Sequence, residues 1–123
     1  MPDLPLQWNT TTAAGAEWAA GFTLLDDDGT PMAINGKAFE FVIRPTVVDA
    51  TPSPLVKVTT TPTVQGYITV DTVTATAQVV LTPTATALLG KGSRPFALWM
   101  DPGQPQQTCL VEGRFNSRPA ASV

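Results

Sequence analysis

Segments in which apolar and polar residues alternate recur along the chain, and proline, glycine or threonine closes them about every 8 to 12 residues. The clearest is KAFEFVIRP, in which Phe39, Phe41 and Ile43 fall on one face and Pro45 closes the segment. A period of two is that of a β-strand with one buried face, whereas a helical pattern repeats about every 3.6 residues. The sequence therefore predicts an all-β domain, a sandwich or barrel of short strands.

Further strands follow from the same alternation in three later segments. Their predicted core faces carry Ala77, Val79 and Leu81; Phe96, Leu98 and Met100; and Cys109, Val111 and Phe115. Weaker patterns rich in threonine and valine predict strands around residues 17–25, 55–60 and 67–71, because β-branched side chains suit a pleated surface. In TPTATALLGKG, Thr82 can cap, Pro83 can open and Gly90 can end one short helical turn over residues 83–89.

The length of 123 residues is that of one domain. Hydrophobic residues make up 43% and charged residues 14%, which is apolar enough to enclose a core. We expect a single β-sandwich domain over residues 15–116, an extended N-terminal arm over residues 1–14 and a mobile tail over residues 117–123. Loops are expected over residues 45–54 and 101–107.

The charge balance indicates which partners are not expected. The net charge is −3 and the seven basic residues form no cluster, so nothing would neutralise a row of phosphates or an anionic membrane surface. No apolar run approaches the roughly 18 residues of a membrane span. The N-terminal MPDLPLQWN lacks the basic start and apolar stretch of a secretion signal, so we expect no Sec-type export.

The residues needed for catalysis are largely missing. The chain has no histidine, which removes the commonest general base and the commonest zinc ligand. Its candidate carboxylates are scattered over different predicted strands: Glu17, Glu40, Asp71 and Glu112. We expect no enzyme and no cofactor. The single cysteine, Cys109, is interpreted as a small buried hydrophobic residue, with an interchain link or a reactive thiol as the alternatives.

The run DDDG fits the calcium-loop pattern only in part. With Gly29 as its glycine, Asp26 and Asp28 fit two ligand positions, but Leu24 and Asn35 stand where the first and last ligands belong. No metal site is therefore predicted, although a loose site in which two carboxylates share a cation stays open. The run is interpreted instead as the polar turn of a hairpin, since Asp and Gly tolerate the backbone angles that tight turns require.

Three tryptophans are candidate protein-interaction residues: Trp8, Trp18 and Trp99. If Leu98 is buried, alternation makes Trp99 point outward, and an outward tryptophan on a strand commonly anchors a protein or sugar. The alternative is that Trp99 is covered by the N-terminal segment or by the loop over residues 101–107.

Four motifs in order give the chain a resemblance to a known family. They are the D-x-D-G-x-P turn of Asp26, Asp28, Gly29 and Pro31; the strand end Ile43 and Arg44; a V-x-L-T strand running into an alanine-threonine turn closed by L-L-G; and L-x-E-G in the last strand. From about Gly15 to Phe115 the chain resembles the N-terminal domain of baseplate upper proteins of tailed bacteriophages and related tail-fibre attachment modules.

The resemblance implies an immunoglobulin-like antiparallel β-sandwich that attaches to other virion proteins and has no catalytic activity. We expect a virion structural protein, assembled in the host cytoplasm, that binds capsid or tail subunits and forms a homo-oligomer within the particle. Because the chain stops after Val123 without a fibre sequence, we expect a decoration, collar, neck or baseplate accessory protein. The alternative is a carbohydrate- or receptor-binding module that uses Trp99 and Tyr67 as its stacking surface.

Overall fold

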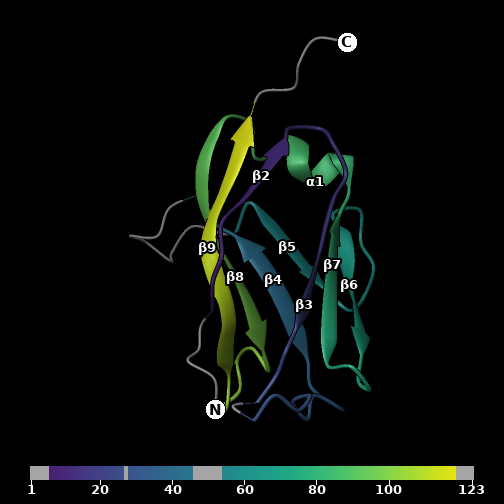
Figure 1. Ribbon diagram of the computed structural model, residues 1–123. Helices are drawn as coiled ribbons and strands as arrows, with labels where there is room; N and C mark the ends of the chain where they lie inside the picture. The colour runs from purple at the N-terminus through teal and green to yellow at the C-terminus, as the bar shows by residue number, and fades with distance from the viewer. Residues whose placement is uncertain (1–5, 27, 46–53, 119–123) are drawn as a thin grey trace.

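The strands of the molecule form two sheets, with one helical turn at one end (Figure 1). The structure is a computed structural model that describes residues 6–26, 28–45 and 54–118. In chain order its elements are β1 (Leu6–Gln7), β2 (Thr10–Ala13), β3 (Trp18–Thr23), β4 (Phe39–Ile43), β5 (Val56–Thr59), β6 (Gly66–Asp71), β7 (Thr76–Leu81), α1 (Pro83–Ala87), β8 (Gly92–Met100) and β9 (Thr108–Arg118). The expected loop over residues 45–54 falls largely on residues 46–53, outside the described residues.

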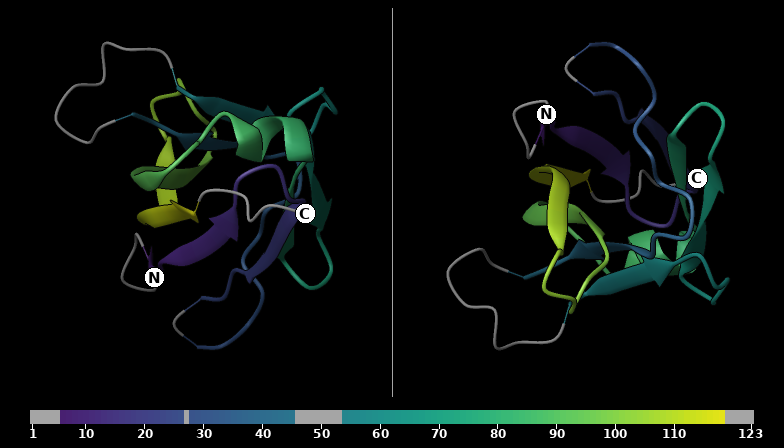
Figure 2. Two further views of the ribbon diagram at one scale, coloured as in Figure 1. Left: turned by 90° about the horizontal axis from the view of Figure 1, so that it is seen from above. Right: turned by 90° about the horizontal axis from the view of Figure 1, so that it is seen from below.

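The strand order is that of an immunoglobulin-like sandwich. The large sheet runs β1, β9, β8, β4, β5, with β2 also paired to β9, and the small sheet runs β3, β7, β6. The order β9, β8, β4 corresponds to strands G, F and C of an immunoglobulin domain, and β3, β7, β6 to strands B, E and D. Figure 2, which looks along the strands, shows the two layers. The predicted all-β, immunoglobulin-like fold is confirmed.

The core between the sheets is built from the predicted strand faces. Phe39, Phe41 and Ile43 of β4 are at most 2% exposed, and the predicted core faces of β7 and β8 are buried in the same way. Trp18 stacks on Phe41 and contacts Phe115, with ring centroids 4.8 Å apart in the second pair, and Phe96 contacts both of these phenylalanines. With one cysteine the chain cannot form the disulfide that pins the sheets of antibody domains together, and this aromatic cluster joins them instead.

A β-bulge changes the phase of the last strand. Leu98 pairs with Val111, but the next residue, Trp99, pairs with Cys109, so Leu110 is the extra residue. Leu110 and Val111 are both buried as a result, whereas Cys109 lies half-buried on the same face as Trp99. The predicted core phase is therefore wrong at Cys109, because a strict period of two cannot account for an inserted residue.

The N-terminal strands belong to the large sheet. Residues 6–13, expected in the N-terminal arm, form β1 and β2, which pair in parallel with β9. Figure 2 shows them beside that strand. At the other end, Ser117 and Arg118 of the expected tail are the last residues of β9. Residues 1–5 and 119–123 lie outside the described residues.

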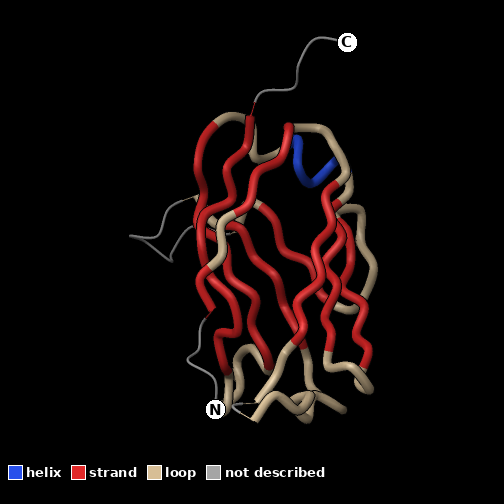
Figure 3. The backbone as a smooth tube through the Cα atoms, in the orientation of Figure 1, coloured by secondary structure: helices blue, strands red, loops and turns tan. Residues whose placement is uncertain are grey.

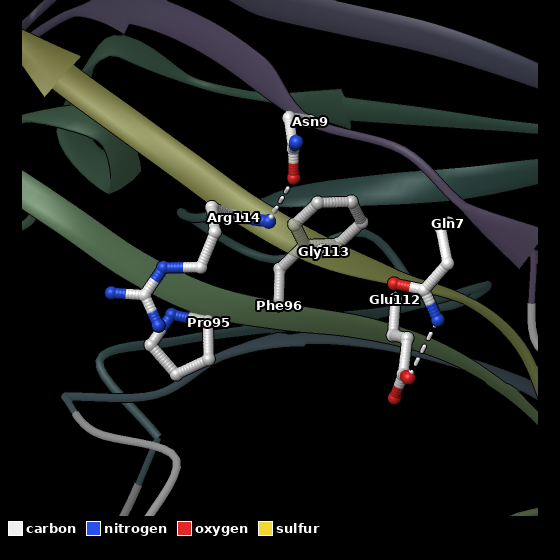
Figure 4. Close-up of a pocket in the computed structure, with 7 residues that line it drawn as sticks. All are labelled: Gln7, Asn9, Pro95, Phe96, Glu112, Gly113 and Arg114. Carbon is white, nitrogen blue, oxygen red and sulfur yellow. Dashed lines mark hydrogen bonds between the residues drawn. The ribbon is translucent and has the colours of Figure 1, made fainter.

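Gly113 lets the N-terminal segment lie close beside β9 between β1 and β2. A Cβ atom at Gly113 would lie 1.7 Å from the carbonyl oxygen of Trp8, far closer than two non-bonded atoms can approach. Before this close approach the Trp8 N–H donates to the Glu112 carbonyl at 3.0 Å. After it the Asn9 side-chain oxygen accepts the N–H of Arg114 at 2.9 Å, as Figure 4 shows. These two hydrogen bonds continue the pairing with β9 from β1 into β2.

The predicted helical turn is confirmed as α1. Thr82 caps it by accepting the N–H of Ala85, and Pro83 occupies its first turn. It ends at Ala87, two residues before the expected boundary. The buried Thr86 hydroxyl donates to the Ala16 carbonyl at 2.7 Å, which anchors the turn to the segment that leads into β3.

Candidate functional site

Asp28 and Thr30 form a turn that is held by side-chain and backbone hydrogen bonds. Asp28 Oδ1 accepts the N–H of Thr30 at 3.0 Å and its hydroxyl at 2.6 Å. Both hydrogen bonds lower the pKa of Asp28 below its ordinary value, and the bond from the Thr30 hydroxyl has the larger effect. The Asp26 carbonyl accepts the N–H of Gly29, whose φ of 83° suits glycine, and Pro31 forms an isolated antiparallel bridge with Leu25, just beyond the end of β3. The Asp28 carboxylate therefore stabilises the turn.

Three of the four scattered carboxylates have separate structural partners. Glu40 forms an ion pair with Lys57 at 3.5 Å. Glu112 accepts a hydrogen bond from the side-chain amide of Gln7 at 2.8 Å. Asp71 accepts the N–H of Val73, in the turn that follows β6, at 2.9 Å. Among residues 6–26, 28–45 and 54–118, no three His, Cys, Asp or Glu side chains gather as a metal site requires. Asp27, the middle residue of the aspartate run, lies outside this described part.

The environment of Cys109 keeps its thiol protonated. Burial raises the pKa of Cys109 to about 11, and the nearby carboxylate of Glu112 adds to the effect. The thiol also donates to the carbonyl of Val111 at 3.6 Å. Because the thiolate is the nucleophilic form, the structure argues against a reactive thiol at neutral pH.

Trp18 lies in the core. Only 8% of the residue is exposed, and its indole N–H donates to the Thr10 hydroxyl at 3.1 Å. Its ring stacks with that of Phe41 and contacts that of Phe115. Trp18 was predicted to be an interaction residue together with Trp8 and Trp99, and the weak alternation over residues 17–25 does not show which face of that strand is buried. The structure places it where it binds the two sheets to each other, with almost no surface for a partner.

Trp8 lies at the surface beside an apolar groove. It is 40% exposed, and its ring packs edge-on against Phe22, with centroids 5.3 Å apart. The groove has a volume of about 270 Å³ and runs between the edge strands β1 and β3. Its lining consists of Leu6, Gln7, Trp8, Gly21, Phe22 and Val111. We call this groove, together with the edge of β3, the open side.

Trp99 borders a second hollow, on the outer face of the large sheet. It alternates with the buried Leu98 and Met100 and so points outward, as predicted, although it is half-buried. The hollow has a volume of about 470 Å³, and we call it the Trp99 hollow. It is lined by Glu40, Arg44, Trp99, Pro102, Gly103 and Gln107.

Tyr67 lies far from this hollow in the fold. It is 36% exposed and alternates with the buried Gly66 and Ile68, so it points outward from the small sheet. The two sheets face each other across the core, and Trp99 points outward from the other one. The single stacking surface expected from Trp99 and Tyr67 is therefore not formed, because alternation within a strand does not tell which sheet the strand joins.

Asp101 joins the β3–β4 and β8–β9 loops, which lie at the same end of the molecule (Figure 3). Its N–H donates to the Ala38 carbonyl at 2.7 Å, and its carboxylate accepts the Ala38 N–H at 3.0 Å. Lys37 lies 3.4 Å from the same carboxylate. Sequence reasoning missed this residue, because a position before proline is normally extended, whereas Asp101 has a φ of 52°. Asp is one of the few residues that tolerate this conformation.

Stability should depend on the ionisation of Asp101. The Ala38 N–H, and then Lys37, hold the pKa of Asp101 below its ordinary value of 3.8. Stability from this lowered pKa is present above about pH 4 and is lost as the pH falls through the folded pKa. We expect Asp101→Asn, which also tolerates this backbone, to flatten the acid limb of a plot of urea midpoint against pH. An unchanged acid limb would contradict a stabilising role for this carboxylate.

Within the described residues, no helix is long and apolar enough to cross a membrane. A scan of the chain against models of known protein families finds no match, and a search of the curated proteins finds none either.

Proposed function

We propose that the protein is a non-enzymatic structural protein of a tailed-bacteriophage particle, which attaches through its open side to a neighbouring capsid or tail subunit. The observation that carries the proposal is an uncharged edge strand beside an exposed apolar groove. β3, with the sequence WAAGFT, has no charged residue, and among the residues that the structure describes it pairs only with β7. Leu6 and Trp8, at the mouth of the groove, are both at least 40% exposed.

An edge of this kind is suited to strand addition. Soluble proteins usually protect an edge strand with lysine, proline, a bulge or a covering segment, because its unpaired backbone groups can bind another chain. β3 has none of the first three. In immunoglobulin domains a further strand, A, lies beside strand B in the small sheet, and β3 corresponds to strand B. An extended segment of a neighbouring subunit could take that place and insert apolar side chains into the groove.

The sequence resemblance supports the phage assignment. The immunoglobulin-like sandwich agrees with the fold that the resemblance implies, and the D-x-D-G-x-P motif forms a turn held by its own side chains. In a particle the same contact would recur in every copy, so a modest affinity per subunit would give a firm attachment. The proposal places the protein in the virion, assembled in the host cytoplasm, with other virion subunits and further copies of itself as partners.

The open side can be tested with two matched leucines. Leu6 is 43% exposed in the groove, whereas Leu88 is 50% exposed at α1, beside the other end of the sandwich. In phage that carry the variant gene, Leu6→Glu should lower the copy number in purified particles by about tenfold or more, since it places a charge in an apolar contact. Leu88→Glu should leave the copy number unchanged. Quantitative mass spectrometry of the particles gives both values.

Two results would count against the proposal. Absence of the wild-type chain from purified particles would reject the virion role as a whole. Equal incorporation of Leu6→Glu and wild type would leave the virion role but reject attachment through the open side. The melting temperature of Leu6→Glu must stay close to that of wild type, so that lost incorporation reports the contact.

A further inference from the structure

The Trp99 hollow combines an aromatic ring with polar groups of several kinds. Trp99 stands directly across from Glu40 in the β4–β8 register. Glu40 and Arg44 bring one charge of each sign, and Gln107 adds a side-chain amide from the β8–β9 loop. The volume of about 470 Å³ is within the range of small-molecule sites in proteins, about 300 to 1,000 Å³.

The polar groups of the hollow are held in place by the fold. The Gln107 side-chain oxygen accepts the N–H of Gly103 at 2.9 Å, which fixes the amide and leaves its NH₂ group for other partners. Lys57, at 3.5 Å, holds the carboxylate of Glu40. The indole N–H of Trp99 has no hydrogen-bond acceptor among the residues that the structure describes. The hollow therefore offers the Glu40 carboxylate as an acceptor, the Gln107 amide as a donor and the indole of Trp99 as an aromatic surface.

We propose that the Trp99 hollow binds an uncharged saccharide. A sugar ring has an apolar face of C–H groups that can lie on an indole, and a rim of hydroxyls that both donate and accept hydrogen bonds. Glu40 accepts from hydroxyls, whereas Gln107 and the indole N–H donate to them. Because the lining holds one acidic and one basic side chain, it favours neither an anionic nor a cationic sugar. The hollow faces away from the core, so this function is independent of attachment through the open side.

An array of defined neutral, acidic and amino oligosaccharides, probed with the full chain, tests the proposal. We expect binding to neutral oligosaccharides. The best of them, in soluble form, should then shift the amide signals of β4, β8 and the β8–β9 loop in a heteronuclear NMR spectrum of the wild-type protein. Trp99→Ala should weaken binding by about tenfold or more, since it removes the stacking ring. The matched change Tyr67→Ala, at an exposed aromatic residue on the outer face of the small sheet, should leave the affinity unchanged.

Three outcomes would overturn the proposal. The first is no binding above background to any neutral oligosaccharide, and the second is binding restricted to charged sugars. The third is a set of shifted amides that lies away from the Trp99 hollow. The NMR mapping uses the wild-type chain, so it decides the question even if Trp99→Ala proves unstable.

Discussion

Replacing Gly113 with alanine should lower the free energy of unfolding by about 2 to 4 kcal/mol. The new Cβ would lie 1.7 Å from the carbonyl oxygen of Trp8, and 3.0 Å from the side-chain oxygen of Asn9. Both atoms belong to the segment that joins β1 to β2 beside β9. Since the close atom is backbone, no side-chain rotation can relieve the clash, and the N-terminal strands must move away from β9. Urea unfolding measures the loss.

Gly21 provides the control for this change. It is also a strand glycine, but its Cβ would meet only a methyl group of Thr76, at an ordinary 3.8 Å. Gly21→Ala should therefore change the free energy of unfolding by less than about 1 kcal/mol. Hydrogen exchange on Gly113→Ala should show the loss of protection concentrated in β1, β2 and their β9 partners. If Gly113→Ala were as stable as Gly21→Ala, the close approach of the N-terminal segment to β9 would be wrong.

Trp18→Ala should be the most damaging single truncation in the aromatic cluster, at about 3 to 5 kcal/mol. It removes the ring that contacts both Phe41 and Phe115, and leaves a cavity between the sheets. It also removes the donor to the Thr10 hydroxyl, which ties β2 to β3. Trp18→Phe should recover part of the stability, because it refills part of the cavity but does not restore this hydrogen bond. Thermal and urea unfolding measure both variants.

Trp8→Ala is the comparison for Trp18→Ala. Trp8 also contacts the cluster, but it is 40% exposed, so its truncation should cost less than half as much as that of Trp18. Equal losses at the two positions would contradict the distinction between a core tryptophan and a surface one. The distinction matters for function, because of the three tryptophans only Trp8 and Trp99 reach the surface.

The local sequence predicted most of the sandwich. The strands around Phe41, Val79 and Leu98 were located by a period of two, and α1 by the sequence of Thr82 and Pro83. Such signals depend on neighbours in the chain, and they were sufficient because each strand has one face on the core. The fold class followed from their number and spacing.

What could not be predicted depends on residues far apart in the chain. The bulge at Leu110 arises from how β9 pairs with β8, so alternation within β9 gave the wrong face for Cys109. β1 and β2 have two and four residues, too few for a period to be recognised, and they are ordered by pairing with β9. The opposite faces of Tyr67 and Trp99 likewise follow from the assignment of strands to sheets.

An electron cryomicroscopy map of the phage particle tests the central claim most directly. The claim predicts density for the immunoglobulin-like sandwich at a repeated position in the particle. An extended segment of a neighbouring subunit should lie along β3 and cover the groove at Leu6 and Trp8. A particle without this sandwich, or one in which β3 and the groove face solvent in every copy, would contradict the claim.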